Sequence, residues 1–415
     1  MARDIYGVLI MRVAVVGLGL RVAGLVELLQ QINPKTRLAG VADPDQARVK
    51  EKLKTLKVNS ESVRLYSSAD QLLHDSSRFD GIMIGTRCHL HTPLAIQAAA
   101  TGLPIFLEKP VAINYRQLTD LARAFTGRED RVVVSFPLRV TPLFEKALEI
   151  VRSGRIGLVN QIQAINNVPY GGVYFGTWYR NYDQVGGLWL QKATHDFDYL
   201  TLLANSQPTE ITAMTTRKIY RGDKPHDLKC SKCDITETCM ESPQNIAKRG
   251  DDGGMGKDDH WCAFSRDIHN QDAGSAIIRY DNDLHISYTQ NFVSRRSAGR
   301  RGAIITGYAG SVDFDWYTFK VRLIEHFTDK VEEFEINALE GHGGGDINLL
   351  KNFIELTRTA APAHPNLTDG LRSVAMCLAA RESSHTRTFQ TIPSIEQIPD
   401  YYDGRPEVNA LTGND

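Results

Sequence analysis

The stretch from Arg12 to Asp43 constrains the fold of this 415-residue chain more than any other. It opens with an apolar, β-branched run, Arg12 to Val16, which lacks the polar alternation of a half-exposed strand and is typical of a strand buried on both faces. Two glycines then turn the chain, and apolar residues recur at helical spacing as far as Gln31. A second strand, Leu38 to Ala42, follows. The pattern predicts the strand, turn, helix and strand of a parallel α/β sheet.

The glycine turn has the chemistry of a dinucleotide site. Gly17 allows a tight turn, and Gly19 allows the backbone to approach a pyrophosphate at the helix N-terminus, where unpaired N–H groups favour an anion. Asp43 stands at the expected distance to bind the ribose hydroxyls of NAD and to repel the extra phosphate of NADP. Val22 replaces the usual third glycine, so helix and strand are expected slightly farther apart. The alternative is a tight turn that binds nothing; NAD is the predicted cofactor, with contacts at Gly17, Gly19, Leu20, Arg21 and Asp43.

Strands and helices continue to alternate as far as residue 136. Buried strands are expected at 81–85, 105–107 and 131–135, with helices between them. This alternation implies right-handed crossovers and a doubly wound parallel sheet, the Rossmann architecture. Residues 1–136 are therefore predicted to form an NAD-binding domain. The first ten residues precede the first buried strand as an extension or an alternative start.

Three further motifs make the chain resemble the glucose-fructose oxidoreductase and inositol dehydrogenase (Gfo/Idh/MocA) family from about residue 11 to residue 390. They are Thr86 with His91, Glu108-Lys109-Pro110 after a strand, and a Gly-Gly pair leading to His195 and Asp198. The resemblance implies that Lys109 lies beside the nicotinamide and assists proton transfer at a substrate hydroxyl. The further cofactor contacts that it implies are Thr86, His91, Glu108 and Lys109.

The resemblance also implies a second domain over residues 137–392. This domain is expected to be α+β, with a large, mostly antiparallel open sheet that binds substrate and supports oligomerisation. A cysteine-rich insert interrupts it at about residues 217–272, and residues 393–415 are expected to form a surface tail. The predicted fold class is thus α/β, a Rossmann domain followed by an α+β domain.

The segment around His195 carries the remaining predicted catalytic groups. A histidine relays protons near neutral pH, and oxidising a secondary alcohol requires removal of the hydroxyl proton as hydride leaves carbon. Asp198 lies three residues along the same helical face and could orient the ring. Dehydrogenases of the family often have an acid four residues before the histidine, where this chain has Gln191 followed by Lys192. We expect Lys192 to supply a second charge in catalysis and Gln191 and Asp198 to contact substrate.

Other stretches are expected to line the substrate pocket. Trp178 and Arg180 combine an aromatic face with hydrogen-bonding groups, a mixture suited to sugar rings, although packing is the commoner use of such aromatics. Arg139 follows the first domain at a position that resembles the family's passage into its second. His342 and Asp346 lie in a glycine-rich turn that resembles one near the substrate in NAD-dependent glycoside hydrolases of the same family. Asp346 could instead cap the following helix.

Four of the six cysteines fall in the insert: Cys230, Cys233, Cys239 and Cys262. Clustered thiols without a secretion signal favour a metal over disulfides, because reducing compartments keep thiols open. Four thiolates would suit a structural zinc ion, with His226 or His260 able to replace one of them. Reduced thiols, an iron–sulfur cluster and a disulfide remain open alternatives.

Charge and hydropathy exclude several classes of partner. Lys plus Arg number 48 against 49 for Asp plus Glu, so no net field favours nucleic acid or an anionic membrane. No apolar run is long enough to span a bilayer, and the first ten residues lack the pattern of a signal peptide. The expected partners are a small carbohydrate and further copies of the chain, in a dimer or tetramer, and the expected location is the cytoplasm.

Three functions are compatible with these residues. The first is NAD-dependent hydride transfer at a secondary hydroxyl of a sugar or cyclitol, in which Lys109 and His195 move the proton. The second is an NAD-dependent glycoside hydrolase that oxidises, eliminates, adds water and reduces again. The third is a sensor that binds NAD and sugar without chemistry, against which the presence of both Lys109 and His195 counts.

Overall fold

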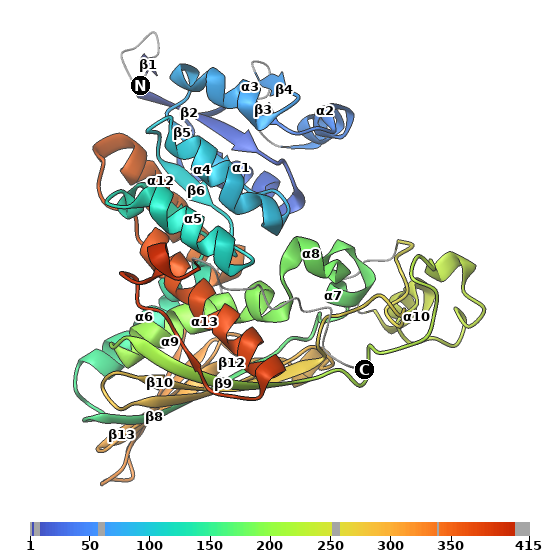
Figure 1. Cartoon of the computed structure of the whole chain (residues 1–415). Helices are drawn as coiled ribbons and strands as arrows, with labels where there is room; N and C mark the ends of the chain where they lie inside the picture. Colours follow the sequence, from blue (N-terminus) through green and yellow to red (C-terminus); the bar gives the residue numbers. More distant parts are fainter. Residues whose placement is uncertain (1, 4–8, 57–62, 251–257, 338–339, 403–415) are drawn as a thin grey trace. The chain divides into compact units, whose positions relative to one another are not determined.

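The computed structural model describes residues 2–3, 9–56, 63–250, 258–337 and 340–402. The chain divides into two compact units, coloured along the sequence in Figure 1. The first comprises residues 1–141, 339–375 and 395–405, and the second comprises residues 142–338, 376–394 and 406–415. The first unit therefore recruits a C-terminal segment in addition to the N-terminal part of the chain.

A parallel sheet forms the centre of the first unit. Its strands lie in the order β4-β3-β2-β5-β6-β7, and every neighbouring pair along this path is parallel. The chain crosses from β4 at one edge to β5 beside β2, which places a topological switch point at the carboxyl end of β2, where α/β sheets bind ligands. The predicted doubly wound parallel sheet is confirmed.

The described elements of the first unit follow the expected alternation. Their bounds are β1 Ala2–Arg3, β2 Leu9–Val16, α1 Leu20–Ile32, β3 Thr36–Ala42, α2 Gln46–Thr55, β4 Arg64–Tyr66, α3 Ala69–His74, β5 Gly81–Ile84, α4 His91–Ala99, β6 Ile105–Leu107, α5 Tyr115–Phe125, β7 Val132–Val134, α11 Glu340–Gly343 and α12 Gly345–Thr359. A short strand, β1, pairs antiparallel with the start of β2. Helix α13, Leu367–Thr386, begins in this unit and ends in the second.

The core of the first unit shows why these segments adopt these elements. Val13 and Val15 of β2 are fully buried, and the apolar stripe of α1 packs on the same cluster. Leu349 and Phe353 of α12 join this cluster, so the C-terminal segment is built into the core. Burial of side chains of this size contributes roughly 1.5–3 kcal/mol each.

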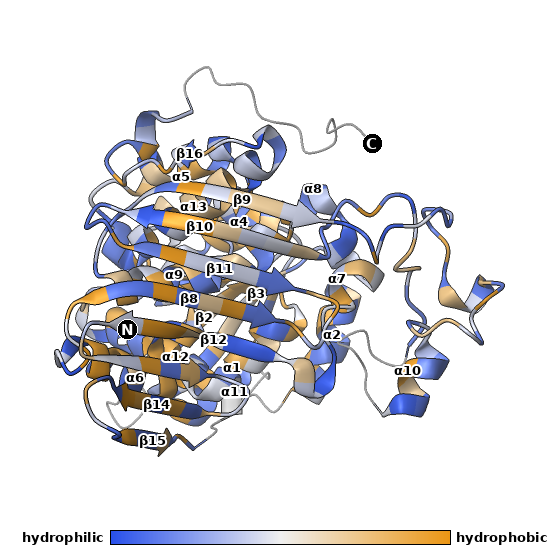
Figure 2. Cartoon of the chain, turned by 90° about the horizontal axis from the view of Figure 1, so that it is seen from below, coloured by the Kyte–Doolittle hydropathy of each residue, from blue (hydrophilic) through white to orange (hydrophobic). Residues whose placement is uncertain are grey.

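The second unit is built on a large open sheet. Its strands lie in the order β15-β14-β13-β12-β8-β11-β10-β9-β16, side by side in Figure 2. Among the pairings of described strands only β8 with β11 is parallel. Strand β10 alternates between exposed and buried residues along most of its length, as expected when one face of a sheet packs on a core. The predicted, mostly antiparallel sheet is confirmed.

Helices cover one face of this sheet. The described elements are α6 Pro142–Arg152, β8 Val159–Asn167, α7 Val173–Gly176, α8 Tyr182–Val185, α9 Thr194–Ala204, β9 Pro208–Thr216, α10 Pro243–Arg249, β10 Ala273–Tyr280, β11 His285–Asn291, β12 Arg300–Gly307, β13 Gly310–Asp315, β14 Lys320–Glu325, β15 Val331–Glu335 and β16 Gln390–Thr391. Within the described residues, no helix combines the length and the apolar character needed to cross a bilayer.

A buried carboxylate fastens α9 to the sheet. Asp196 is fully buried and accepts hydrogen bonds from Asn166 Nδ2 at 2.7 Å, from the Tyr288 hydroxyl at 2.7 Å and from Arg301 Nε at 2.8 Å. The three donors come from strands β8, β11 and β12. Because the neighbouring residue in α9 is His195, this network fixes the backbone that carries the predicted catalytic histidine.

We expect Asp196→Asn to lower the free energy of unfolding by about 3–5 kcal/mol, because the substitution leaves the Arg301 guanidinium buried without its counter-charge. Urea denaturation would measure the change. The control is Asp313→Asn, which removes the partner of the adjacent Arg300 in a half-exposed ion pair and should cost at most about 1 kcal/mol. An equal loss of unfolding free energy in both variants would contradict the role of Asp196 as the buried partner of Arg301.

Candidate functional site

The glycine turn of the first unit lies where β2 and β5 end. Gly17 has a φ of +85°, and a Cβ atom there would lie 2.7 Å from Thr86 Cγ2, so only glycine fits. At Gly19 a Cβ atom would meet only Gly85 O, at 3.8 Å, which is ordinary contact. Packing within the protein therefore does not require glycine at position 19. The open side of Gly19 fits a pyrophosphate at the start of α1.

Val22 and Gly85 explain how α1 approaches the sheet without a third glycine. A Cβ atom on Gly85 would lie only 2.0 Å from Val22 Cγ2. The space that the helix needs is therefore supplied from the strand side of the contact. The wider spacing that was expected between α1 and the sheet is not required. Gly85, 63 positions further along the chain than Val22, makes the room that a glycine at position 22 would have made.

Asp43 is held at the glycine turn and is almost fully buried. Its carboxylate accepts hydrogen bonds from the Leu18 backbone N–H at 3.2 Å and from Arg48 Nη2 at 2.6 Å. Arg48 also donates to the Leu18 carbonyl oxygen, at 3.2 Å. This arginine was not predicted from the sequence, although its place one turn into the helix after Asp43 is a signal that could have found it. A ribose at Asp43 would meet a carboxylate already oriented by a cation.

Arg21 is the centre of an ionic cluster in the first unit. Its Nε donates to Glu108 at 3.1 Å, while Nη1 and Nη2 bind the two carboxylate oxygens of Asp346 at 2.7 and 2.5 Å. His342 Nδ1 lies 2.9 Å from Asp346, and Ser135 donates to Glu108 at 2.9 Å. The cluster joins the start of α1, the Lys109 loop and the glycine-rich turn before α12.

Opposite charges inside this cluster shift the pKa values of Arg21 and Asp346. Burial alone would lower the pKa of Arg21, but Glu108 and Asp346 raise it above the ordinary value. Burial alone would raise the pKa of Asp346, but hydrogen bonds from Arg21 and His342 hold it well below its usual range. Both groups are therefore charged at neutral pH. Both Asp346 oxygens serve Arg21, while a direct contact of His342 or Asp346 with substrate stays a prediction.

His91 ties the Thr86 loop to the Lys109 loop. The histidine is buried; its Nδ1 lies 2.9 Å from the Pro110 carbonyl oxygen, and its Nε2 lies 3.2 Å from the Thr86 carbonyl oxygen. Burial lowers the pKa of His91, and its backbone partners oppose this only in part. Both ring nitrogens thus face protein carbonyls, which favours a positioning role beside the predicted cofactor contacts.

The two predicted catalytic residues of the second unit, Lys192 and His195, lie on one helical stretch. Residues Trp189–Ala193 form a π-helical turn that runs directly into α9. Such turns occur often at functional sites, because they displace side chains from the regular helical register. Lys192 lies in the π turn, and His195, which is buried, lies one turn later. Asp198 is buried on the same helix.

Lys192 is enclosed by aromatic rings. Its Nζ lies 2.5 Å from the Tyr170 hydroxyl, 4.5 Å from the centre of the Tyr170 ring and 5.7 Å from that of Tyr174. Burial lowers the pKa of Lys192, and the nearby Arg301 charge acts in the same direction, whereas Tyr170 opposes it. Tyr170 is 37% exposed, so this pair reaches the surface of its unit. Tyr170 was not predicted, since nothing in its local sequence distinguishes it.

The other predicted substrate residues have partners within their own units. Gln191 is buried and donates through Nε2 to the Val185 carbonyl oxygen at 3.3 Å. Arg139 is buried, and its Nη1 forms an ion pair with the partly buried Asp369 at 2.9 Å. Trp178 stacks on Tyr179, with ring centres 3.9 Å apart. These contacts position the side chains, and their contact with substrate stays a prediction.

Arg180 faces the cysteine-rich insert. Its guanidinium donates to the carbonyl oxygens of Cys262 and His226, each at 3.2 Å, to Asp267 at 2.6 Å and to the Ser265 hydroxyl. The side chain is buried by these partners. The geometry gives Arg180 a role in anchoring the insert, in addition to the predicted role at substrate.

The four insert cysteines line one cavity of about 120 Å³. All are free thiols in the structure. Burial, together with the neighbouring Cys262, Cys239 and Cys233, raises the pKa of Cys230 to about 12. Among the described residues, however, no three His, Cys, Asp or Glu side chains are grouped so that they could hold one metal ion. The predicted zinc site is therefore not supported.

Family models match both units. Residues 11–136 match the model of an oxidoreductase family with an NAD-binding Rossmann fold, GFO_IDH_MocA. Residues 144–313 match the model of the GFO/IDH/MocA C-terminal domain. Together the two matches cover more than half of the chain.

Two relatives that are distant in sequence extend over most of the chain. The myo-inositol 2-dehydrogenase of Thermotoga maritima is 24% identical over 375 residues, which cover 90% of this chain and 96% of the relative. The Bacillus subtilis protein YteT, which bears an oxidoreductase name, is 22% identical over 78% of this chain and 83% of its own length. A levoglucosan dehydrogenase solved with NADH and L-sorbose superposes with a TM-score of 0.74 at 17% identity, over 93% of this chain and all of that chain. At this identity the superposition supports the fold.

We expect Asp43→Ser to weaken NADH binding by roughly 10- to 100-fold, because a charged hydrogen-bond acceptor for the ribose is lost. The same change should weaken NADPH binding less, because Arg48 becomes available to a 2′-phosphate. Calorimetry with both cofactors would measure the ratio. Glu51→Gln, an exposed position on α2, is the control, and an unchanged ratio in Asp43→Ser would show that the acid does not face the ribose.

Proposed function

The chain belongs to the Gfo/Idh/MocA family of NAD-binding oxidoreductases, and on this basis we propose that it oxidises a secondary hydroxyl of a sugar or cyclitol. The observation that carries the proposal is the Arg21 cluster, which holds Glu108, and with it the Lys109 loop, against the glycine turn. Relatives named for myo-inositol and levoglucosan support the choice of a polyhydroxylated substrate. Bound NAD supplies the hydride acceptor.

In this proposal the chain's own residues bind the cofactor and move one proton. Gly17 and Gly19 would hold the pyrophosphate of bound NAD, and Asp43 would hold its ribose. Lys109 and His195 would move the single hydroxyl proton away as the hydride leaves the same carbon, so that the alcohol loses one proton and one hydride and becomes a ketone. Lys192 supplies a cation to the substrate's oxygen atoms in place of the acid that the family often has at position 191.

We would incubate the purified chain with a panel of free sugars, cyclitols and aryl glycosides while following NADH absorbance and aglycone release. Stoichiometric NADH from a free polyol is the expected result. Release of the aglycone without net NADH would assign the glycoside hydrolase reaction instead. NAD binding without either product would favour a sensor. Cytoplasmic location and a dimeric or tetrameric state stay predictions.

We expect Lys109→Met to lower kcat by about 10²- to 10⁴-fold, the range typical of a lost proton-transfer group. NADH affinity should change only a few-fold, because Lys109 acts on the substrate hydroxyl. The exposed Lys35→Met is the control for removal of a positive charge. A variant that turns over substrate at the wild-type rate would overturn the assigned role of Lys109.

The pKa of Lys192, which burial lowers from its ordinary value, predicts an alkaline limit to activity. If its ammonium binds substrate, kcat/KM should fall as pH rises through a pKa below the ordinary 10.5. Lys192→Arg, which stays charged, should move this limit to higher pH, and Lys192→Met should lower kcat/KM at every pH. Lys320→Met, at a half-exposed position of β14 far along the chain from Lys192, is the control. A pH profile unchanged in Lys192→Arg would remove Lys192 from substrate binding.

A further inference from the structure

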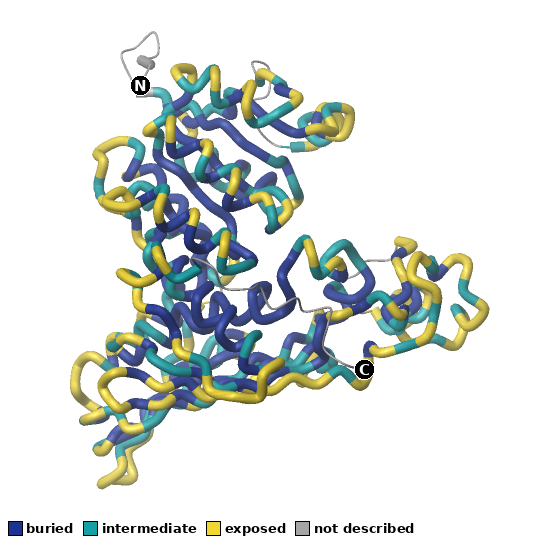
Figure 3. Tube along the Cα trace, viewed as in Figure 1, coloured by how far each residue is buried: buried dark blue, intermediate teal, exposed yellow. Residues whose placement is uncertain are grey.

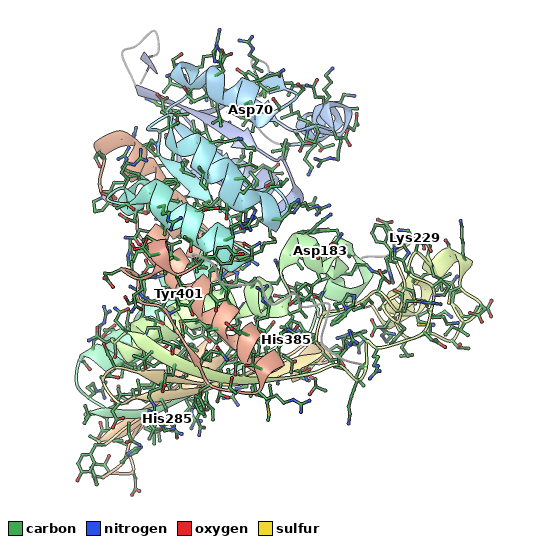
Figure 4. The ribbon with its side chains drawn as sticks, in the orientation of Figure 1. Asp70, Asp183, Lys229, His285, His385 and Tyr401 are labelled. Carbon is green, nitrogen blue, oxygen red and sulfur yellow. The ribbon has the colours of Figure 1, made fainter. Side chains whose placement is uncertain are left out.

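One end of the large sheet carries Tyr170, Lys192 and Arg301. Arg301 of β12 is paired with Asn166 near the end of β8, and Tyr170 follows Asn166 by four residues. His285, labelled in Figure 4, begins the parallel strand β11 and marks the opposite end of these strands. Lys192 reaches the same end as Tyr170, because its Nζ lies 2.5 Å from the Tyr170 hydroxyl. Burial lowers the pKa of Lys192, and Arg301 lies close enough to lower it further.

Lys192 is a buried cation whose described contacts are aromatic. The turn that carries it and the start of α9 are buried throughout, dark blue in Figure 3. Its Nζ contacts the hydroxyl and ring of Tyr170 and the ring of Tyr174. Asp196, four residues further along, uses both carboxylate oxygens on Arg301 and on two neutral donors. Since a buried ammonium is costly without a counter-charge, the site is suited to receive one negative charge.

A second lysine of the same unit shows the usual arrangement. Lys146 Nζ lies 4.6 Å from the centre of the Phe334 ring, close to the 4.5 Å between Lys192 Nζ and the centre of the Tyr170 ring. Lys146 is less buried, and it forms an ion pair with Glu149 at 3.0 Å. Among the described residues, the more deeply buried Lys192 forms no such pair with a carboxylate. The contact with a ring is therefore shared by both lysines, and the difference lies in the counter-charge.

Arg301 supplies a second cation with an unused donor. Its Nε donates to Asp196 at 2.8 Å, whereas its Nη2 is buried and has no acceptor among the described residues. The Asp315 carboxylate accepts the backbone N–H groups of Arg301 at 3.2 Å and of Tyr317 at 2.9 Å, which places Tyr317 at the same edge. Asp315 is partly exposed, so solvent screens its charge more than that of a buried group. Tyr170 and Tyr317 are 37% and 42% exposed, so the edge is open to solvent.

We propose that Lys192 and the Tyr170 hydroxyl, beside the positive charge of Arg301, bind the carboxylate of a sugar acid, and that the substrate is a hexuronate. The inference rests on the proposed function and names its substrate class. An ammonium has three N–H donors, of which Tyr170 accepts one, so donors remain for a carboxylate. The carboxylate is unchanged in the reaction, in which a secondary hydroxyl of the same sugar loses one proton and one hydride.

The charge of the site favours a carboxylate over a phosphate. A carboxylate carries one negative charge, which matches the one ammonium that lacks a described carboxylate partner. A phosphate monoester carries about −1.5 to −2 charges at pH 7, more than this ammonium neutralises. The exposed tyrosines at the edge combine an apolar ring with a hydroxyl, a mixture that suits the C–H face and the hydroxyls of a sugar.

The test is calorimetry of the full chain with NADH bound, so that no oxidation occurs, at constant ionic strength. D-glucuronate, D-galacturonate and D-mannuronate are compared with D-glucose, D-galactose and D-mannose. In at least one pair the uronate should bind roughly 10- to 100-fold more tightly than its parent hexose, the gain typical of a hydrogen bond to a charged group. Lys192→Met should abolish this preference, and Lys192→Arg should retain most of it.

Lys146→Met is the matched control, because it removes a lysine that also lies over an aromatic ring but has its own carboxylate partner. It should keep the wild-type preference for uronates. Equal affinities in every wild-type pair, or no binding of any uronate, would overturn the carboxylate site. Tighter binding of D-glucose 6-phosphate than of every uronate would overturn it in favour of a phosphate. These readings need only the wild-type chain, so they hold even if a variant fails to fold.

NADH formation from NAD separates this inference from the proposed reaction. A uronate that binds in preference to its hexose but is not oxidised would keep the carboxylate site and remove the reaction. Neutral hexoses or cyclitols that are oxidised with the same kcat/KM as the uronates would keep the reaction and overturn the carboxylate site.

Discussion

The bidentate contact between Arg21 and Asp346 is the interaction on which the first unit depends. It joins residues 325 positions apart and brings a C-terminal helix, α12, to the glycine turn. Arg21 then uses its remaining nitrogen on Glu108, the residue before Lys109. A buried carboxylate without a cation is costly, so each of these three groups is stable there only because the others are present. The turn, the lysine loop and α12 are thereby held in one arrangement.

In the second unit, too, a buried carboxylate and its cation hold separate segments together, although the residues are different. Asp196 in α9 receives donors from three strands, and the charged one among them is the buried Arg301. Burial alone would lower the pKa of Arg301, but Asp196 raises it above its ordinary value, so the pair stays ionised. A charged anchor gives α9 both a place and a rotation about its axis, which apolar packing alone specifies less strictly. His195, the residue next to Asp196, is therefore held in the orientation that this ion pair gives to α9.

Local patterns were sufficient to predict the parallel sheet of the first unit. The buried run before Gly17, the alternation of strands and helices and the acid at position 43 each depend on neighbours in sequence, and the parallel sheet followed from them. The family motifs extended the prediction to the mostly antiparallel sheet. The partners of the charged residues could not be predicted, because Arg21 with Asp346 and Asp196 with Arg301 meet only after folding. For the same reason, the sequence did not predict that the Val22 side chain occupies the space left by the missing side chain of Gly85.

The cysteines show how far spacing alone can carry an argument about chemistry. Four thiols in one polar segment indicate a shared ligand, but the sequence leaves zinc, a cluster, free thiols and a disulfide open. The structure adds two facts that spacing does not contain: the thiols line one cavity, and no three described ligands surround a single point within it. A tetrahedral ion requires the opposite of the second fact.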